Sequence, residues 1–212
     1  ETMIKSIEKY GGFYIGRYEL SGTVDKPTEK KGTTITSKTW YELYNACKKI
    51  GGSDKEGIAT RMIWGCQWDA TCDFISKKGE QKSITNSSTW GNYSDSTSPA
   101  NTGNYEKWRR KDTGSNEYWK ANNIYDIAGN CYEWTQEADR TIFRAYRGGG
   151  CKHSGSDRPA SGRSSESPTI SYVDSNRFSS HFNNYYWNLE RGVTSVALFL
   201  CLQARLCKQK IT

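Results

Sequence analysis

The chain has 212 residues, of which 34% are hydrophobic and 25% charged, and it contains no apolar run of about 18 residues that could cross a membrane. This composition argues against a membrane-spanning helix, and we expect no signal peptide within these residues. An aromatic content of 13% argues against a disordered chain. The length fits one large domain or two small ones. Because the chain begins with Glu1 rather than Met, we expect it to be part of a longer protein.

The positive charge lies in the last third of the chain. The net charge is +7, and residues 1–139 carry 19 basic and 19 acidic side chains, whereas residues 140–212 carry 11 basic and 4 acidic ones. A basic face can attract nucleic acid or acidic glycans. However, the longest basic run is the three residues from Arg109 to Lys111, which favours a solvated surface. We therefore expect no nucleic-acid partner.

The first half of the sequence predicts one strand and two helices. Residues 11–19 alternate between two sets of side chains, as a strand does. Thr39 and Glu42 have the spacing of a capping box, which predicts a helix over residues 40–50. A second helix is predicted over residues 59–75. Its predicted stripe consists of Ile63, Gln67, Ala70 and Phe74.

The second half predicts loops and strands. Residues 80–121 are polar with isolated aromatic residues, which predicts an ordered loop region whose aromatic side chains are packed. Strands are predicted at residues 131–135 and 142–147, and an apolar, central strand at residues 193–202. We therefore expect a single α+β domain over residues 1–212, with two helices, antiparallel sheets and much irregular loop. The aromatic residues of the loop region at residues 80–121 that we expect to be packed are Trp90, Tyr93, Trp108 and Trp119.

The seven cysteines contain no C-x-x-C pair, which argues against a zinc ribbon or a thioredoxin motif. An odd number of cysteines cannot all pair within one chain. We expect most of them to be reduced, buried thiols, which favours synthesis in a reducing compartment.

Residues 171–188 have an unusual composition, because six of the 18 are aromatic, four are Ser and four are Asn. Binding loops of antibodies use these residue types, since Tyr and Trp supply rigid contact area and Ser and Asn supply adaptable hydrogen bonds. Two interpretations stay open. The segment either contributes to a binding surface, with Tyr185 and Trp187 as contacts, or packs its aromatic side chains onto its own domain.

Residues 123–135 read N-I-Y-D-I-A-G-N-C-Y-E-W-T, and Arg147 is followed by two glycines. This pattern resembles the signature of the formylglycine-generating enzyme (sulfatase-modifying factor) family, a variant of the C-type lectin fold. The resemblance implies a C-type lectin-like domain in which this block is mainly scaffold. In the family, the Asn and Glu of the motif lie near a calcium site, which implies a candidate calcium site near Asn130 and Glu133.

The catalytic set of that family is incomplete in this chain. Its catalytic members hold copper with two cysteines that stand five residues apart, and the matching positions here are His153 and Arg158. Cys151 is followed five residues later by Ser156. A second branch binds iron through histidines, of which this chain has only two. We therefore expect no enzyme activity, cofactor or metal. The alternative is a copper-dependent formylglycine-generating oxidase acting on a cysteine in a substrate protein.

Residues 147–169 resemble the variable segment of diversity-generating-retroelement variable proteins, in which a reverse transcriptase rewrites chosen surface positions on a fixed lectin-like frame. The fixed elements R-G-G, G-S, P-A-S, R and P-T all occur, at residues 147–149, 155–156, 159–161, 163 and 168–169. The predicted contact residues are Cys151, Lys152, His153, Ser154, Asp157, Arg158, Gly162, Ser164, Ser165, Glu166 and Ser167, together with Tyr185 and Trp187.

The resemblance implies a non-enzymatic display protein that binds a protein or glycan ligand through residues 150–190. Exposed side chains on such a frame can change without unfolding it. We expect no membrane insertion. The compartment (phage particle, cell surface or cytoplasm) and the oligomeric state stay open.

Overall fold

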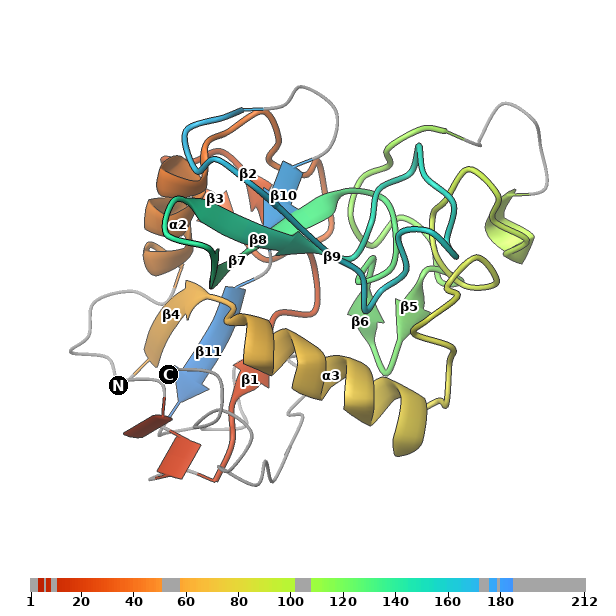
Figure 1. The fold of residues 1–212 in the computed structure, drawn as a ribbon, viewed down its shortest axis with the longest axis horizontal. Coiled ribbons are helices and arrows are strands. Elements are labelled where there is room, and N and C mark those ends of the chain that lie inside the picture. Colours follow the sequence, from red (N-terminus) through yellow and green to blue (C-terminus); the bar gives the residue numbers. More distant parts are fainter. Residues whose placement is uncertain are drawn as a thin grey trace.

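The computed structural model describes residues 4–5, 7–8, 11–50, 58–101, 108–171, 176–178 and 180–184. These residues form an α+β fold with small, mainly antiparallel sheets (Figure 1). The predicted fold class is therefore confirmed. The helices are α2 (Trp40–Lys48), α3 (Gly65–Lys77) and the 3-10 helix η2 (Pro99–Asn101). The strands are β1 (Tyr14–Ile15), β2 (Ser21–Gly22), β3 (Pro27–Thr28), β4 (Ile58–Met62), β5 (Lys120–Ala121), β6 (Ile124–Tyr125), β7 (Tyr132–Asp139), β8 (Phe143–Arg147), β9 (Arg163–Glu166), β10 (Asn176–Phe178) and β11 (Ser180–Asn184).

The largest sheet has four strands in the order β10-β7-β8-β9. β8 pairs antiparallel with both β7 and β9, and β10 pairs parallel with β7. The register places Tyr146 of β8 between Trp134 of β7 and Ser164 of β9. Residues near the end of the predicted variable segment thus belong to the main sheet.

The capping box at the start of α2 is confirmed. The Glu42 amide donates to Thr39 Oγ1 at 3.3 Å, and the Thr39 amide donates to Glu42 Oε2 at 2.8 Å. Leu43 on the inner face of α2 is fully buried and packs in one cluster with Trp134 of β7. Local sequence alone specifies the start of this helix, because both capping partners lie within one turn.

The second helix begins six residues later than predicted. Residues 58–62 form β4, which pairs antiparallel with β11, and α3 begins only at Gly65. Thr60 and Met62 are buried while Arg61 between them is half-buried, which is the period of a strand. A long-range pairing therefore overrides the local helical pattern at this position.

The segment of residues 171–188, predicted as a loop, contributes two strands. Residues 176–178 form β10 and residues 180–184 form β11, which lies between β1 and β4. Because a sheet needs only backbone groups, a segment without a clear two-residue period can still pair as a strand. Tyr185, Trp187 and the strand predicted at residues 193–202 lie outside the described residues.

The core has two main clusters. One surrounds Trp68 of α3 and includes Trp90 and Tyr93 from the loop region, and the other surrounds Leu43 of α2. Three of the four loop aromatics, Trp90, Tyr93 and Trp119, are buried as predicted. The prediction for Trp108 is wrong, since its side chain is 58% exposed.

The five cysteines of the described residues are thiols, as expected. Four of them are buried, and Cys66 is half-buried. No helix in the described ranges is long and apolar enough to cross a membrane.

Candidate functional site

Residues 150–167 run beside the loops of residues 80–121 and end in the edge of the main sheet (Figure 1). The backbone of this segment is tied at several points. Gly155 O accepts a hydrogen bond from the Ser87 amide at 2.9 Å, and Ala160 O accepts one from the indole N–H of Trp68 at 2.8 Å. The path of the segment is therefore set by the scaffold rather than by its own exposed side chains.

Arg147 links three elements at the base of the segment. Its side chain is buried, donates to Ser161 O at 2.8 Å and forms an ion pair with Asp69 of α3. Arg163 of β9 also contacts Asp69, at 3.2 Å, and reaches Glu137 of β7 at 3.1 Å. Burial, with a smaller effect from Arg163, lowers the pKa of Arg147 to about 9, so the guanidinium is still protonated at neutral pH.

Most predicted contact residues lie at the surface. Lys152, Asp157 and Arg158 are exposed. The half-buried ones are His153, Ser154, Gly162, Ser164, Ser165, Glu166 and Ser167. Exposure alone does not separate them from the predicted fixed positions, because Ser156 and Thr169 are exposed as well.

The prediction that Cys151 contacts a ligand is wrong in this structure. Its side chain is only 2% exposed, and its thiol donates to Trp108 O at 3.6 Å. Its amide donates to Asn130 O at 3.0 Å. A small apolar side chain fits such a covered position, and Cys is among the most often buried residue types. Cys151 therefore belongs to the scaffold.

Five side chains from three parts of the chain form what we name the Arg158 patch: Tyr132, Tyr146, His153, Arg158 and Ser164. The ring of Tyr132 packs edge-to-face against Tyr146 (centroids 4.8 Å apart) and against His153 (5.2 Å). The Arg158 guanidinium donates to Ser164 Oγ. Sequence reasoning missed the two tyrosines, because only the strand register brings β7, β8 and β9 together.

The patch combines aromatic area with charge. Burial raises the pKa of Tyr132 to about 12, and the nearby Arg158 acts in the opposite direction. Burial and then the charge of Arg158 lower the pKa of His153, so its imidazole is neutral at pH 7. The patch therefore combines a guanidinium, a neutral imidazole and a hydroxyl with the half-buried ring of Tyr146 and the buried ring of Tyr132.

Two of the remaining predicted contacts, Ser154 and Ser165, point away from this patch. Ser164 and Glu166 lie on one face of β9, whereas Ser165 points to the other face and donates to Asp139. Ser154 Oγ donates to Asp95 at 2.8 Å. The predicted set is thus divided over several surfaces.

The side-chain oxygen of Asn130, one of the two residues of the implied calcium site, is already used by hydrogen bonds. Asn130 Oδ1 accepts N–H groups from Asn92 at 2.9 Å and from Lys111 at 2.8 Å, so both lone pairs are used. Its amide nitrogen donates to Glu19 at 3.0 Å. Glu133, the second implied ligand, is buried. In the described ranges, no group of three or more His, Cys, Asp or Glu side chains could hold a metal ion.

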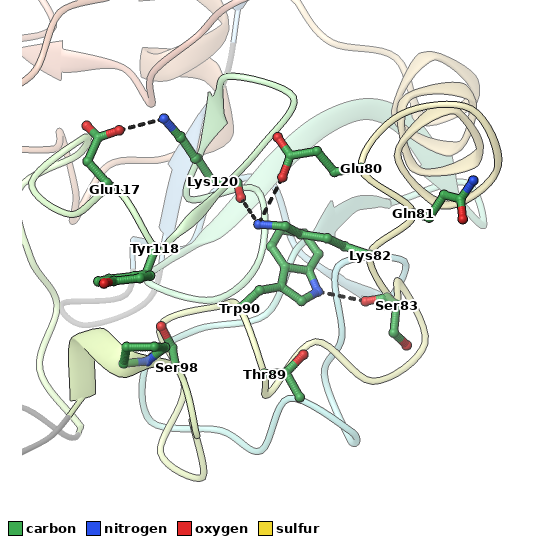
Figure 2. A pocket seen from close by; sticks show the side chains of 11 residues that line it. Glu80, Gln81, Lys82, Ser83, Thr89, Trp90, Ser98, Glu117, Tyr118 and Lys120 are labelled. Carbon is green, nitrogen blue, oxygen red and sulfur yellow. Dashed lines mark hydrogen bonds and ion pairs between the residues drawn. The ribbon is translucent and has the colours of Figure 1, made fainter.

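A pocket of about 440 Å³ lies elsewhere, among the loops at residues 80–120 (Figure 2). Its charged groups pair with one another: Lys82 contacts Glu80 at 3.2 Å, and Lys120 contacts Glu117 at 2.5 Å. Trp90 packs beneath Lys82. None of the predicted contact residues lines this pocket. The other lining residues are Gln81, Ser83, Thr89, Ser98, Pro99 and Tyr118.

Known protein families and curated proteins give no match to the sequence. Among solved structures, the chain is similar to Treponema denticola variable protein 1, with 17% identity over 73% of this chain and 72% of that chain and a TM-score of 0.45. It is also similar to PvdO from Pseudomonas aeruginosa, with 14% identity over 85% of this chain and 75% of that chain and a TM-score of 0.49. Likenesses of this size are too weak to assign a function.

Proposed function

We propose that this chain is a non-enzymatic ligand-binding domain. It displays side chains of residues 150–167 on a C-type lectin-like frame, in the manner of diversity-generating-retroelement variable proteins, and binds a protein or glycan. One observation supports this proposal most. The backbone at the fixed elements is tied to the scaffold, whereas Lys152, Asp157 and Arg158 between them project into solvent.

The energetic contrast between the exposed positions and the buried ones among the fixed elements supports the same function. Exchange of an exposed side chain away from caps and networks changes stability by less than about 0.5 kcal/mol. By contrast, a Cβ atom at Gly155 would lie 2.4 Å from the Ser88 amide nitrogen, so this position accepts no side chain without a shift of the backbone. Ligand specificity can therefore change while the fold is kept.

A pair of display libraries tests the proposal. The first library randomises exposed and half-buried positions, and the second randomises buried ones. We expect the first to give folded variants that yield binders against an unrelated purified protein, and the second to give mainly unfolded chains. The first library covers residues 152, 157, 158, 164 and 166, and the second covers 149, 155 and 160. Unfolding of most members of the first library would contradict the proposal.

The neighbouring DNA provides an independent test. The proposal requires a near-identical copy of the stretch that encodes residues 150–190, differing only at adenines and accompanied by a reverse transcriptase gene. If the genome has neither the copy nor the reverse transcriptase gene, the segment is not diversified, and the proposed display function is wrong.

The alternative copper oxidase needs two thiolates, since soft thiolates suit Cu(I). Burial raises the pKa of the Cys131 thiol well above its usual range, and the nearby Cys151 raises it further. This environment disfavours thiolates. Copper retained in stoichiometric amount by the wild-type chain, and lost in Cys151→Ser, would favour the oxidase over the display domain.

A further inference from the structure

Trp108 combines exposure with an unusual backbone conformation. Its side chain is 58% exposed, and its backbone φ is 72°, in the left-handed region. Bulky side chains rarely adopt this region, and strained backbone of this kind occurs preferentially at functional sites. Arg109 and Arg110, which follow it, are exposed as well.

Buried side chains fix the backbone that carries Trp108. Asn92 Nδ2 donates to Arg109 O at 3.1 Å, and the Lys111 amide donates to Asn130 Oδ1 at 2.8 Å. Both asparagines are fully buried. The backbone of residues 108–111, which we name the Trp108 loop, is therefore held from inside the domain, while the side chains of Trp108, Arg109 and Arg110 are exposed.

The Trp108 loop adjoins the predicted variable segment. The buried thiol of Cys151 donates to Trp108 O, and the next residue in the chain, Lys152, is exposed. Trp and Arg are enriched among the residues that dominate the binding energy of protein interfaces. A rigid element also loses little conformational freedom on binding, so more of its contact energy contributes to affinity.

We propose that the Trp108 loop is a fixed protein-binding element, whose partner surface is acidic and has an apolar recess for the indole. The exposed cations Arg109 and Arg110 provide the charge complementarity. Exposed Asp112 and Asp157 accompany them, which disfavours the continuous phosphate backbone of a nucleic acid and favours a protein. The loop lies outside residues 150–167, so this inference does not depend on exchange of the variable segment.

A random peptide library selected on the intact chain tests this inference. We expect the enriched peptides to combine net negative charge with a large apolar residue. Trp108→Ala, and separately Arg109→Ser with Arg110→Ser, are expected to weaken their binding by about 10- to 30-fold. Two controls are matched for exposure and charge, namely Tyr118→Ala and Lys77→Ser with Lys78→Ser, and should bind as the wild type does. Circular dichroism checks that every variant is folded.

The inference is wrong if the enriched peptides carry no net negative charge, or if the folded Trp108→Ala variant binds them as the wild type does. It is also wrong if the chain binds duplex DNA more tightly than the peptides through Arg109 and Arg110. A combined Lys152→Ala, Asp157→Ala and Arg158→Ala variant separates the two proposals. If it abolishes peptide binding while Trp108→Ala does not, the loop proposal fails and the variable-segment proposal stands.

Discussion

Asp126 shows how far burial can shift the pKa of a single side chain in this fold. Its carboxylate is buried and accepts hydrogen bonds from Thr113 Oγ1 at 3.1 Å and from the Gly114 amide at 2.9 Å. Burial raises its pKa from 3.8 to about 7, while these two hydrogen bonds act in the opposite direction. The folded chain therefore binds a proton at Asp126 that the unfolded chain releases near pH 4.

The pH dependence of stability follows from this shift. Because the folded pKa is raised, the contribution of Asp126 to the free energy of unfolding is largest below about pH 4 and is lost as the pH rises to about 7. Asp126→Asn keeps an acceptor for Thr113 and Gly114 but cannot ionise. We expect it to be more stable than the wild type at pH 8, by on the order of 2–4 kcal/mol, and similar at pH 4. Urea unfolding at both pH values measures the difference, and an equal effect at both would contradict it.

Two neighbouring glycines provide a matched pair of substitutions. Gly149 has a φ of 74°, and a Cβ there would lie 2.0 Å from Arg158 O. At Gly150 the nearest atom, in His153, would be 3.6 Å away, which is an ordinary contact. We expect Gly149→Ala to cost at least about 2 kcal/mol of stability and Gly150→Ala less than about 1 kcal/mol. Thermal unfolding of both variants tests this, and equal melting temperatures would show that the backbone at Gly149 is not constrained.

Helix α3 is joined to strands β8 and β9 by one cluster of charges. Arg147 and Arg163 both contact Asp69 of α3, but Arg147 is buried and Arg163 is exposed. The two arginines therefore differ in what their removal leaves behind. Without Arg147, the carbonyl of Ser161 loses its donor inside the protein.

Substitution of each arginine should therefore reduce the stability of the fold by a different amount. We expect Arg147→Met to destabilise the fold by about 2–4 kcal/mol, since a buried charged donor is lost. Arg163→Met should cost no more than about 1 kcal/mol, because exposed ion pairs contribute little. Chemical denaturation of both variants gives the comparison. A larger loss for Arg163→Met would mean that the exposed pair holds the sheet edge.

The elements also differ in how much of them could be predicted. Both capping partners of α2 lie within one turn, so the local pattern sufficed. The strand β4 was missed because its partner is β11, about 120 residues further along the chain. Tyr132 and Tyr146 were missed for another reason, because their rings meet only once β7 and β8 have paired. Trp108 was expected to be packed, because aromatic content alone does not show that buried asparagines hold its backbone at the surface.

At the scale of the whole molecule, the described residues divide into tied backbone and displayed side chains. Two buried clusters around Trp68 and Leu43 contain side chains from the loops and from the main sheet. The charge of the chain is the other global property, and its excess of +7 comes entirely from the last third.

This charge permits a simple test against a nucleic-acid function. Because the exposed basic residues are accompanied by acidic ones, we expect no binding of duplex DNA at physiological salt. Fluorescence anisotropy with a labelled duplex at low and physiological salt measures this. Tight binding that falls steeply with added salt would favour a nucleic-acid partner instead.

The burial of Gly149, Cys151, Gly155 and Ala160 matters for the gene as well as for the fold. Codons for glycine, cysteine and alanine carry no adenine in their first two bases, whereas those for Lys152 and Asp157 do. An enzyme that rewrites adenines could therefore alter the exposed Lys152 and Asp157 and would leave these four covered residues unchanged. In such a system the genetic code itself would protect the interior during diversification.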